Sequence, residues 1–237
     1  MTERERPLLA VLIDADNVPA KYAARVMHEV ASIGEPALRR VYGDWSNEQL
    51  KGWKEPIHQL GLVAHQETAN SSGKNATDIG LVIHAMDILH SGRFDAFVIV
   101  SSDSDFTALV NRLREEGVTV IGIGEAKTNS ALRNVYNRFI LIENIEDEDG
   151  GPEQDKPSPK PPADLNRAYQ LIQTAINRCN TEDEWVSLSP VGAALMAAHP
   201  DFDTRTYGYA KLSTLIKALP KLELSIRDNH PKVRIRP

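Results

Sequence analysis

Short apolar runs alternate with longer amphipathic stretches along the first 145 residues of the chain. The apolar runs predict strands, at 8–13, 38–42, 62–65, 96–100, 118–123 and 139–142. Most of them are continuous rather than alternating, as expected for strands that are buried on both faces. The stretches between them predict helices, at 19–34, 47–60, 77–90, 106–116 and 130–136. Strands that alternate with helices predict an α/β domain with a parallel sheet and right-handed crossovers.

The pattern stops at residues 146–162, which read EDEDGGPEQDKPSPKPP. This segment has no apolar side chain other than proline, and an acidic run is followed by a Pro-rich run. Such a composition cannot bury a core and predicts an extended, solvated linker. The linker divides the chain into a larger domain, residues 1–145, and a smaller one, residues 163–237.

The smaller domain has a different pattern. Three amphipathic stretches predict helices at 165–179, 189–199 and 207–219, and two short apolar runs, 222–226 and 233–235, predict a hairpin. Three helices followed by a hairpin are the outline of a winged helix-turn-helix, which is expected as a second, smaller domain.

Composition narrows the class of protein. Of the 237 residues, 41% are hydrophobic and 25% are charged, which is typical of a soluble globular protein and excludes wholesale disorder. The single cysteine, Cys179, excludes an internal disulfide and fits a reducing compartment. No apolar run approaches the roughly 20 residues that a bilayer span needs. We therefore expect a cytoplasmic protein without a membrane partner.

Charge is unevenly distributed. The formal net charge is −6, yet residues 161–237 hold ten Lys and Arg against eight Asp and Glu. The chain as a whole is therefore not built for tight non-specific binding to nucleic acid, although its last third is mildly basic.

Acidic residues follow two of the predicted strands. Asp14 and Asp16 come directly after the first strand, and Asp103 and Asp105 come after the fourth. In doubly wound sheets, ligands bind at the carboxyl ends of strands near the switch point. If strands one and four are neighbours, as in the strand order 3-2-1-4-5, Asp14 and Asp103 project into one crevice, and Asp78 in the first turn of the third helix can then close the cluster.

Crowded carboxylates repel one another unless a cation joins them, and their hard oxygens suit Mg²⁺ or Mn²⁺. One or two such ions activate water and stabilise a leaving oxygen in phosphodiester hydrolysis. Asn17 adds an amide that is suited to orienting a water or a phosphate. The predicted metal ligands are Asp14, Asp78, Asp103 and Asp105.

Each acid also has a structural interpretation. Asp16 and Asn17 before Pro19 form an ordinary helix-cap sequence, and Asp105 could cap the helix that starts at Phe106. Asp78 is favoured near a helix start by the helix dipole alone. Asp14 and Asp103 are harder to explain in this way because they end two buried strands.

Three segments carry a resemblance to a known family: Leu-Ile-Asp-Ala-Asp-Asn at 12–17, Gly-Lys-Asn-Ala-Thr-Asp at 73–78, and Val-Ser-Ser-Asp-Ser-Asp-Phe at 100–106. They resemble the motifs of the NYN domain, in the PIN-like nuclease superfamily, and its bacterial LabA-like branch most of all. The resemblance implies a Rossmann-like PIN fold and metal-dependent cleavage of RNA. It also implies an acidic site of Asp14, Asp78, Asp103 and Asp105 with Asn17 beside it. Ser102 departs from the branch, which more often has Gly there.

The segments Ser-Pro-Val-Gly at 189–192 and Tyr-Gly-Tyr-Ala-Lys-Leu-Ser-Thr-Leu-Ile at 207–216 resemble an OST-HTH (LOTUS) domain. This resemblance implies binding of RNA, single-stranded in our interpretation, with docking of a protein partner as the other use of such a domain. The candidate RNA contacts are basic: Lys211, Lys217, Arg227, Lys232, Arg234 and Arg236, together with Lys74 in the Gly-rich loop of the first domain.

Two other functions remain open from the sequence. Asp14-Ala-Asp16 also resembles the start of a haloacid dehalogenase-like phosphatase, in which Asp14 would be a covalent nucleophile. Pro19 speaks against that interpretation, because a helix that starts there leaves no room for the usual insertion. A non-catalytic RNA-binding adaptor with a vestigial acidic site is the other alternative. The seven histidines show no metal-ligand spacing, so no zinc site is predicted.

Overall fold

The structure is a computed structural model that describes residues 5–67, 76–145, 164–179, 183–227 and 230–236. The chain divides into two compact units, Met1–Asp149 and Gly150–Pro237, which we describe separately. The segment predicted as a linker, 146–162, lies outside the described residues. None of the helices that the structure describes combines the length and hydrophobicity of a membrane span.

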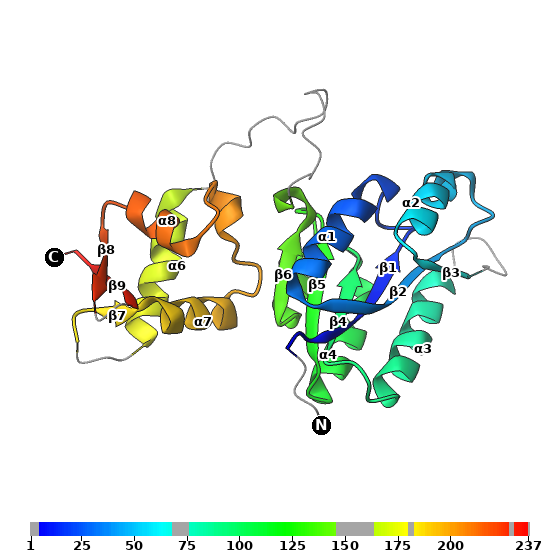
Figure 1. Cartoon of the computed structure of the whole chain (residues 1–237), viewed down its shortest axis with the longest axis horizontal. Coiled ribbons are helices and arrows are strands. Elements are labelled where there is room, and N and C mark those ends of the chain that lie inside the picture. Colours follow the sequence, from blue (N-terminus) through cyan, green and yellow to red (C-terminus); the bar gives the residue numbers. More distant parts are fainter. Residues whose placement is uncertain (1–4, 68–75, 146–163, 180–182, 228–229, 237) are drawn as a thin grey trace. The chain divides into compact units, whose positions relative to one another are not determined.

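The N-terminal unit is built on a six-stranded parallel sheet (Figure 1). The strands are β1 (Leu8–Asp14), β2 (Glu35–Gly43), β3 (Val63–Gln66), β4 (Ala96–Val100), β5 (Thr119–Gly124) and β6 (Arg138–Leu141). Their spatial order is β3-β2-β1-β4-β5-β6. The condition under which the acids would meet is therefore fulfilled: strands β1 and β4 are neighbours in the order 3-2-1-4-5, with β6 added at one edge. Strands β1 to β3 are added towards one edge of the sheet, and strands β4 to β6 are added towards the other. The carboxyl ends of β1 and β4 therefore form the switch point of the sheet.

Helices cover both faces of this sheet. The helices are α1 (Ala23–Ile33), α2 (Lys54–Gln59), α3 (Ala76–His90), α4 (Thr107–Glu115) and α5 (Ser130–Val135), and short 3₁₀ turns are η1 (Ala20–Tyr22), η2 (Glu48–Trp53), η3 (Ser104–Phe106) and η4 (Ile142–Asn144). Residues of α1 and η2 pack in the core on one face, and residues of α3, α4 and α5 pack in the core on the other.

The core follows from the alternation of side chains along the central strands. In β1, Leu9, Val11 and Ile13 contribute to the α1 side, whereas Ala10 and Leu12 contribute to the α3 side, and all five are buried. Continuous apolar strands are thus explained by burial on both faces. Because Asp14 has the same parity as Leu12, its side chain belongs to the face that α3 and α4 cover.

The C-terminal unit combines helices with a small antiparallel sheet. Its elements are α6 (Leu165–Arg178), β7 (Val186–Ser187), α7 (Leu188–Ala198), η5 (Thr204–Tyr207), α8 (Leu212–Ala218), β8 (Leu222–Arg227) and β9 (His230–Ile235). The strand order is β7-β9-β8. The predicted hairpin is observed as β8 paired with β9, and the two-residue strand β7 adds to it.

The helix predicted at 207–219 is wrong in its first part. Tyr207 ends the 3₁₀ turn η5, and Gly208 has φ +82°, a left-handed conformation that a helix cannot continue through. Helix α8 begins only at Leu212, after Lys211 in extended conformation. The apolar spacing across 207–216 is therefore shared between two short elements.

Candidate metal centre

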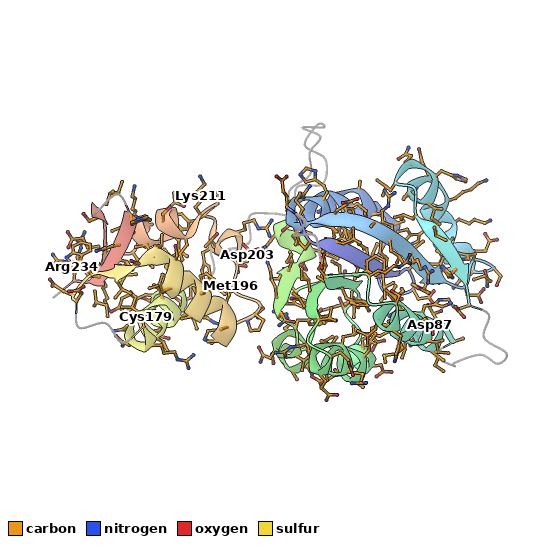
Figure 2. The ribbon with its side chains drawn as sticks, turned by 60° about the horizontal axis from the view of Figure 1, so that its bottom comes forward. Asp87, Cys179, Met196, Asp203, Lys211 and Arg234 are labelled. Carbon is orange, nitrogen blue, oxygen red and sulfur yellow. The ribbon has the colours of Figure 1, made fainter. Side chains whose placement is uncertain are left out.

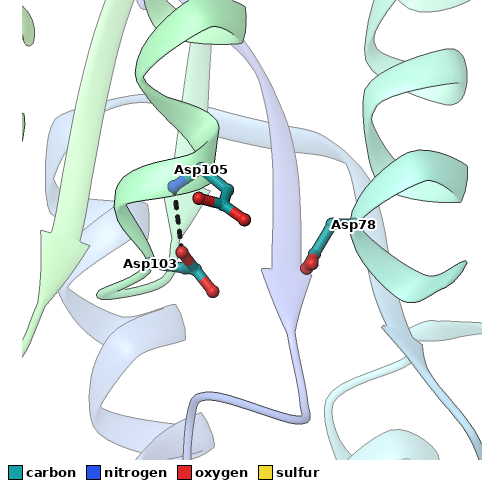
Figure 3. A group of neighbouring side chains, drawn as sticks. All are labelled: Asp78, Asp103 and Asp105. Carbon is teal, nitrogen blue, oxygen red and sulfur yellow. Dashed lines mark hydrogen bonds between the residues drawn. The ribbon is translucent and has the colours of Figure 1, made fainter. Parts of the chain in front are cut away.

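Three carboxylates meet at the carboxyl ends of the central strands. Asp78, Asp103 and Asp105 each offer an oxygen, and these oxygens all lie within 4.8 Å of one another. Figure 3 shows Asp78 on α3 facing Asp103 and Asp105, which lie at the turn into α4, across the end of β1. We call these three residues the acidic triad. The structure thus brings together three of the four acids that the sequence predicts as metal ligands.

The turn after β4 fixes two members of the triad. Ser101 follows the strand, and its hydroxyl accepts a hydrogen bond from the backbone N–H of Asp103 at 3.1 Å. The Asp103 carboxylate in turn accepts from the N–H of Asp105 at 2.9 Å, which caps the 3₁₀ turn η3 (Figure 3). The cap predicted at Asp105 is therefore supplied by Asp103 instead. The exposed Asp105 carboxylate faces the other two members of the triad.

Asp14 lies next to the triad but has different surroundings. It is fully buried, and one oxygen accepts from the N–H groups of Asp16 and Asn17 at 3.1 and 3.3 Å. Its other oxygen accepts from Asn17 Nδ2 at 2.7 Å and from the Ser101 hydroxyl at 2.8 Å. A carboxylate with this many donors is held in one orientation. That Asp14 itself is a metal ligand stays a prediction.

Asp16 and Asn17 do not cap the helix that follows. The residue that precedes η1 is Pro19, which makes no side-chain cap bond. Instead Asp16 accepts a hydrogen bond from the Thr77 hydroxyl at 2.6 Å, and Asn17 orients Asp14. The structural interpretation of these two residues as caps is wrong, because both bind partners that position the site. Asp16 thereby ties the end of β1 to the first turn of α3.

The pKa of Asp78 reflects both its burial and the negative charges around it. Burial, and then the charges of Asp14, Asp103, Asp105 and Asp16, raise the pKa of this carboxyl to about 6. Burial also raises the pKa of Asp14, although the hydrogen bonds from Ser101 and Asn17 oppose that rise. No basic side chain acts on the pKa of either group among the described residues. The described charges that act on these two pKa values are therefore all negative, and they repel one another.

Backbone packing beside the triad depends on Gly124. A Cβ at this position would lie 2.8 Å from the carbonyl oxygen of Ser101 and 3.0 Å from the hydroxyl of Ser102. The Ser102 hydroxyl also accepts from the N–H of Glu125 at 2.9 Å. The end of β5 thus supports the segment that carries Asp103.

Sequence reasoning missed Ser101 and Thr77, which hold the site from two sides. Both are buried polar residues close in sequence to a predicted acid: Ser101 is two residues before Asp103, and Thr77 is directly before Asp78. Their position at the end of an apolar strand or in the first turn of a helix was the signal, because a buried hydroxyl there requires a partner.

Among the basic residues of the C-terminal unit, Arg234 is engaged with acids. It forms ion pairs with Glu223 and Glu184 at 2.7 and 2.8 Å, and its guanidinium lies over the Trp185 ring at 4.7 Å. The hydrogen bond to Glu223 is the main cause that raises the pKa of Arg234. Figure 2 shows Arg234 on the small sheet, whereas Lys211 lies near the start of α8.

The other predicted RNA contacts differ in exposure. Lys211, Lys217 and Arg236 are exposed, and Lys232 is half-buried. Arg227 ends β8, and nothing is described of its side chain. Lys74 lies outside the described residues. The structure therefore presents three exposed cations of the predicted set, two of them on or next to α8.

Two domain families match the chain. The NYN domain matches residues 8–143, and the OST-HTH/LOTUS domain matches residues 165–234. The first match covers more than half of the chain, so the protein belongs to the NYN domain family. The α/β fold with its parallel sheet and the smaller C-terminal domain agree with both families.

Solved structures give more distant likenesses. A crystal structure of a protein of unknown function from Vibrio parahaemolyticus is 20% identical, with a TM-score of 0.49, and the match covers 60% of this chain and 96% of that one. A solution NMR structure of an uncharacterised protein from Nitrosomonas europaea is 24% identical, with a TM-score of 0.29, and the match covers 38% of this chain and 90% of that one. No curated protein matches the chain.

Fold and site together define the class. The protein combines a nuclease-like NYN domain, which contains an acidic cluster of Asp78, Asp103 and Asp105, with an OST-HTH domain of the RNA-binding type.

Proposed function

We propose that the protein is a metal-dependent ribonuclease that hydrolyses phosphodiester bonds of RNA at the acidic triad. The observation that carries the proposal is the convergence of three carboxylates within 4.8 Å, where the neighbouring charges that raise the pKa of Asp78 are all negative. Convergence of like charge at the switch point of a sheet destabilises the fold and is retained for binding.

The residues present fit a hard divalent cation. Carboxylate oxygens on three different backbone positions match the ligands that Mg²⁺ and Mn²⁺ prefer, and no thiol or imidazole is part of the triad. A cation there would lower the raised pKa of Asp78, so binding and ionisation of the triad favour each other. We propose Asp78, Asp103 and Asp105 as its ligands, with Asp14 as a further predicted ligand.

When bound, a divalent cation supplies an activated water nucleophile and stabilises negative charge on the leaving oxygen. The chain's own residues prepare the place for this chemistry. Ser101 bridges Asp14 and the backbone of Asp103, and so fixes the ends of β1 and β4 relative to each other. Asn17 donates to Asp14 and, in our proposal, helps to orient the scissile phosphate or the water.

The burial of Asp14 disfavours the phosphatase alternative. A covalent nucleophile must reach the phosphorus atom, whereas the Asp14 side chain is 0% exposed and both its oxygens accept hydrogen bonds. Asp103 and Asp105 are more accessible, which suits metal binding. We therefore propose nuclease rather than phosphatase chemistry.

We propose that the C-terminal domain binds the RNA substrate. We propose that Lys211, Lys217 and Arg236 contact phosphates of single-stranded RNA, with Lys232 beside them. Because Arg234 pairs with Glu223 and Glu184, we propose that it acts as a structural cation and that RNA is bound by the other predicted cations. Lys74 stays a candidate phosphate contact of the catalytic domain.

The direct test is cleavage of labelled single-stranded RNA by the whole protein, with Mg²⁺, Mn²⁺ or a chelator. We expect cleavage only with metal and its loss in Asp78→Asn. Asp87→Asn is the matched control, because it makes the same chemical change on the same helix, about 13 Å further along. Cleavage that persists in the chelator, or an Asp78→Asn variant as active as the parent, would contradict the proposal. A small phosphate monoester serves as the substrate that only a phosphatase would use.

A further inference from the structure

The loop that follows β5, residues 125–128, lies beside the segment that carries Asp103. Strands β4 and β5 are neighbours in the sheet (Figure 1). Lys127 follows the last residue of β5 by three positions, as Asp103 follows the last residue of β4. The backbone N–H of Glu125 donates to the hydroxyl of Ser102, the residue before Asp103, at 2.9 Å. The two segments are therefore joined directly at the carboxyl edge of the sheet. We call residues 125–128 the β5 loop.

Several hydrogen bonds hold the backbone of the β5 loop. The N–H of Ala126 donates to the two carboxylate oxygens of Glu143 at 2.8 and 3.0 Å. Arg133 donates to the carbonyl oxygens of Ala126 and Thr128, to the latter at 2.9 Å. The N–H of Thr128 donates to the carbonyl oxygen of Glu125 at 3.0 Å, which closes the turn. A side chain on such a loop starts from a fixed backbone position, so less conformational entropy is lost when it binds a ligand.

Lys127 is exposed on this loop. Its side chain is 74% exposed and forms an ion pair with Glu125, which is 20% exposed. The hydrogen bond and charge of Glu125, and then the charges of Glu143 and Tyr22, raise the pKa of Lys127, so it is a cation at neutral pH. An ammonium group has three donors, and an exposed ion pair contributes little to stability. A phosphate oxygen can therefore bind Lys127 beside the Glu125 carboxylate or in its place.

A second exposed lysine lies near the β5 loop. Tyr22 on η1, which acts on the pKa of Lys127, packs against the core on the α1 side of the sheet. The ammonium nitrogen of Lys21 lies 5.1 Å from the centre of the Tyr22 ring, and the guanidinium carbon of Arg25 lies 4.9 Å from it. Basic side chains from η1, α1 and the β5 loop thus gather around one tyrosine.

The charge of an RNA strand explains what a cation at this position would do. A metal ion at the acidic triad offsets the charge of the phosphate that is cleaved, but the next phosphates of the strand still face negative side chains. Lys127 is not among the charges that act on the pKa of Asp78, so it lies outside the triad itself. Its place after the neighbouring strand suits a phosphate next to the one that is cleaved.

We propose that Lys127 is a phosphate contact of the catalytic domain, which holds the RNA strand at a phosphate next to the one that is cleaved, with Lys21 as a second contact further along the strand. This inference rests on the proposed ribonuclease function for the identity of the ligand. It places a described RNA contact in the N-terminal unit, in addition to the candidate Lys74.

The first test compares Lys127→Gln with Lys51→Gln in cleavage of labelled single-stranded RNA by the whole protein with metal. Lys51 is a matched control, because it is 72% exposed and forms an ion pair with Glu48. We expect Lys127→Gln to raise KM about three- to tenfold, between the effects of an exposed ion pair and of a charged hydrogen bond. kcat should stay unchanged, because a phosphate that does not react is bound equally in the ground state and the transition state. Lys127→Arg should restore KM.

A double-mutant cycle separates direct contact from an effect through Glu125. Lys127→Gln also leaves the Glu125 carboxylate without its lysine, and that charge could repel RNA by itself. We therefore repeat the substitution in a Glu125→Gln background. A rise in KM of similar size there supports direct contact. Loss of the effect there would overturn the proposal, because Lys127 would then act only by neutralising Glu125.

Binding of a fluorescent single-stranded RNA in a chelator provides a readout without cleavage. We expect the log–log dependence on salt to become shallower by about 0.7 in Lys127→Gln, and by about as much again when Lys21→Gln is added. KM and salt dependence both equal to those of Lys51→Gln would overturn the contact, and normal cleavage by that variant would keep the nuclease. A parent that cleaves no RNA, combined with a shallower salt dependence in Lys127→Gln, would reject the nuclease and keep the contact.

Discussion

The acidic triad of the NYN domain and Arg234 of the OST-HTH domain show two opposite uses of charge. Asp78, Asp103 and Asp105 crowd together, and burial together with the neighbouring negative charges raises the pKa of Asp78. Arg234 is met by Glu223 and Glu184, and its pKa is raised by these partners. In the first case folding brings like charges together at a cost, and in the second it pairs opposite charges. The contrast teaches that charges of one sign brought close together, rather than charge itself, indicate a binding site.

The largest effect that tests this contrast is expected from removing one carboxylate of the triad. We expect Asp103→Asn to lower the rate of RNA cleavage at least about a hundredfold, because loss of residues that only support a metal ligand already costs 10- to 100-fold. Rates and circular dichroism should be measured on the same preparation. Asp95→Asn serves as the control, since Asp95 precedes β4 at the opposite end of the strand. A folded Asp103→Asn variant that cleaves normally would show that the triad is not the site.

Metal binding should offset the loss of folding stability that the crowded carboxylates of the triad cause. A cation that binds only the folded state, present at a hundred times its Kd, stabilises that state by about 2.7 kcal/mol. We therefore expect Mg²⁺ or Mn²⁺ to raise the melting temperature of the N-terminal unit and Asp78→Asn to reduce that rise. Thermal denaturation with metal and with chelator measures it. No change in the parent protein at millimolar metal would argue that the triad binds no cation.

A pair of substitutions in the C-terminal domain sharpens the other half of the contrast. Lys211→Gln should make the salt dependence of RNA binding shallower by about 0.7, the share of one phosphate contact with a single strand. Arg234→Met should leave that dependence unchanged and lower the melting temperature of this domain by a few degrees, because it loses its carboxylate partners and the Trp185 ring. The reverse assignment of effects would make Arg234 the RNA contact.

The smallest expected effect concerns how the free energy of unfolding depends on pH in the absence of metal. The folded state raises the pKa of Asp78 from 3.8 to about 6, so between these values it binds more protons than the unfolded state. Stability contributed by this group therefore falls as pH rises through that window. Urea denaturation at pH 4 and pH 6 in a chelator tests this, with Asp78→Asn as the variant that flattens the difference. An identical pH dependence in parent and variant would assign it to other groups.

The larger domain could be predicted well from sequence because its strands are buried on both faces. The run Ala96–Val100 was predicted with the bounds that the structure shows, and the third helix was placed within one residue of α3. The C-terminal helix at 207–219 failed because an apolar spacing says nothing about the backbone of Gly208, which is left-handed. The strand β7 has only two residues and gives no periodic signal.

The acids of the site could be predicted, but their environments could not. That Asp103 and Asp78 meet follows from strand order and the position of each residue at the end of an element. The donor from Ser101 to Asp14 spans 87 positions and depends on the pairing of β1 with β4 at atomic detail. The pairing of Arg234 with Glu223 depends on the register of the β8–β9 hairpin.

The glycine at position 124 sets a limit on how this site can change during evolution. Any side chain there would push against Ser101 and Ser102, and thus against the segment that carries Asp103. Its backbone angle is one that other residues adopt, so a substitution such as Gly124→Ala would be tolerated in a sheet without this neighbour. In this family we therefore expect natural variation at position 124 to be restricted for as long as the acids are under selection, and to widen in descendants that have lost them.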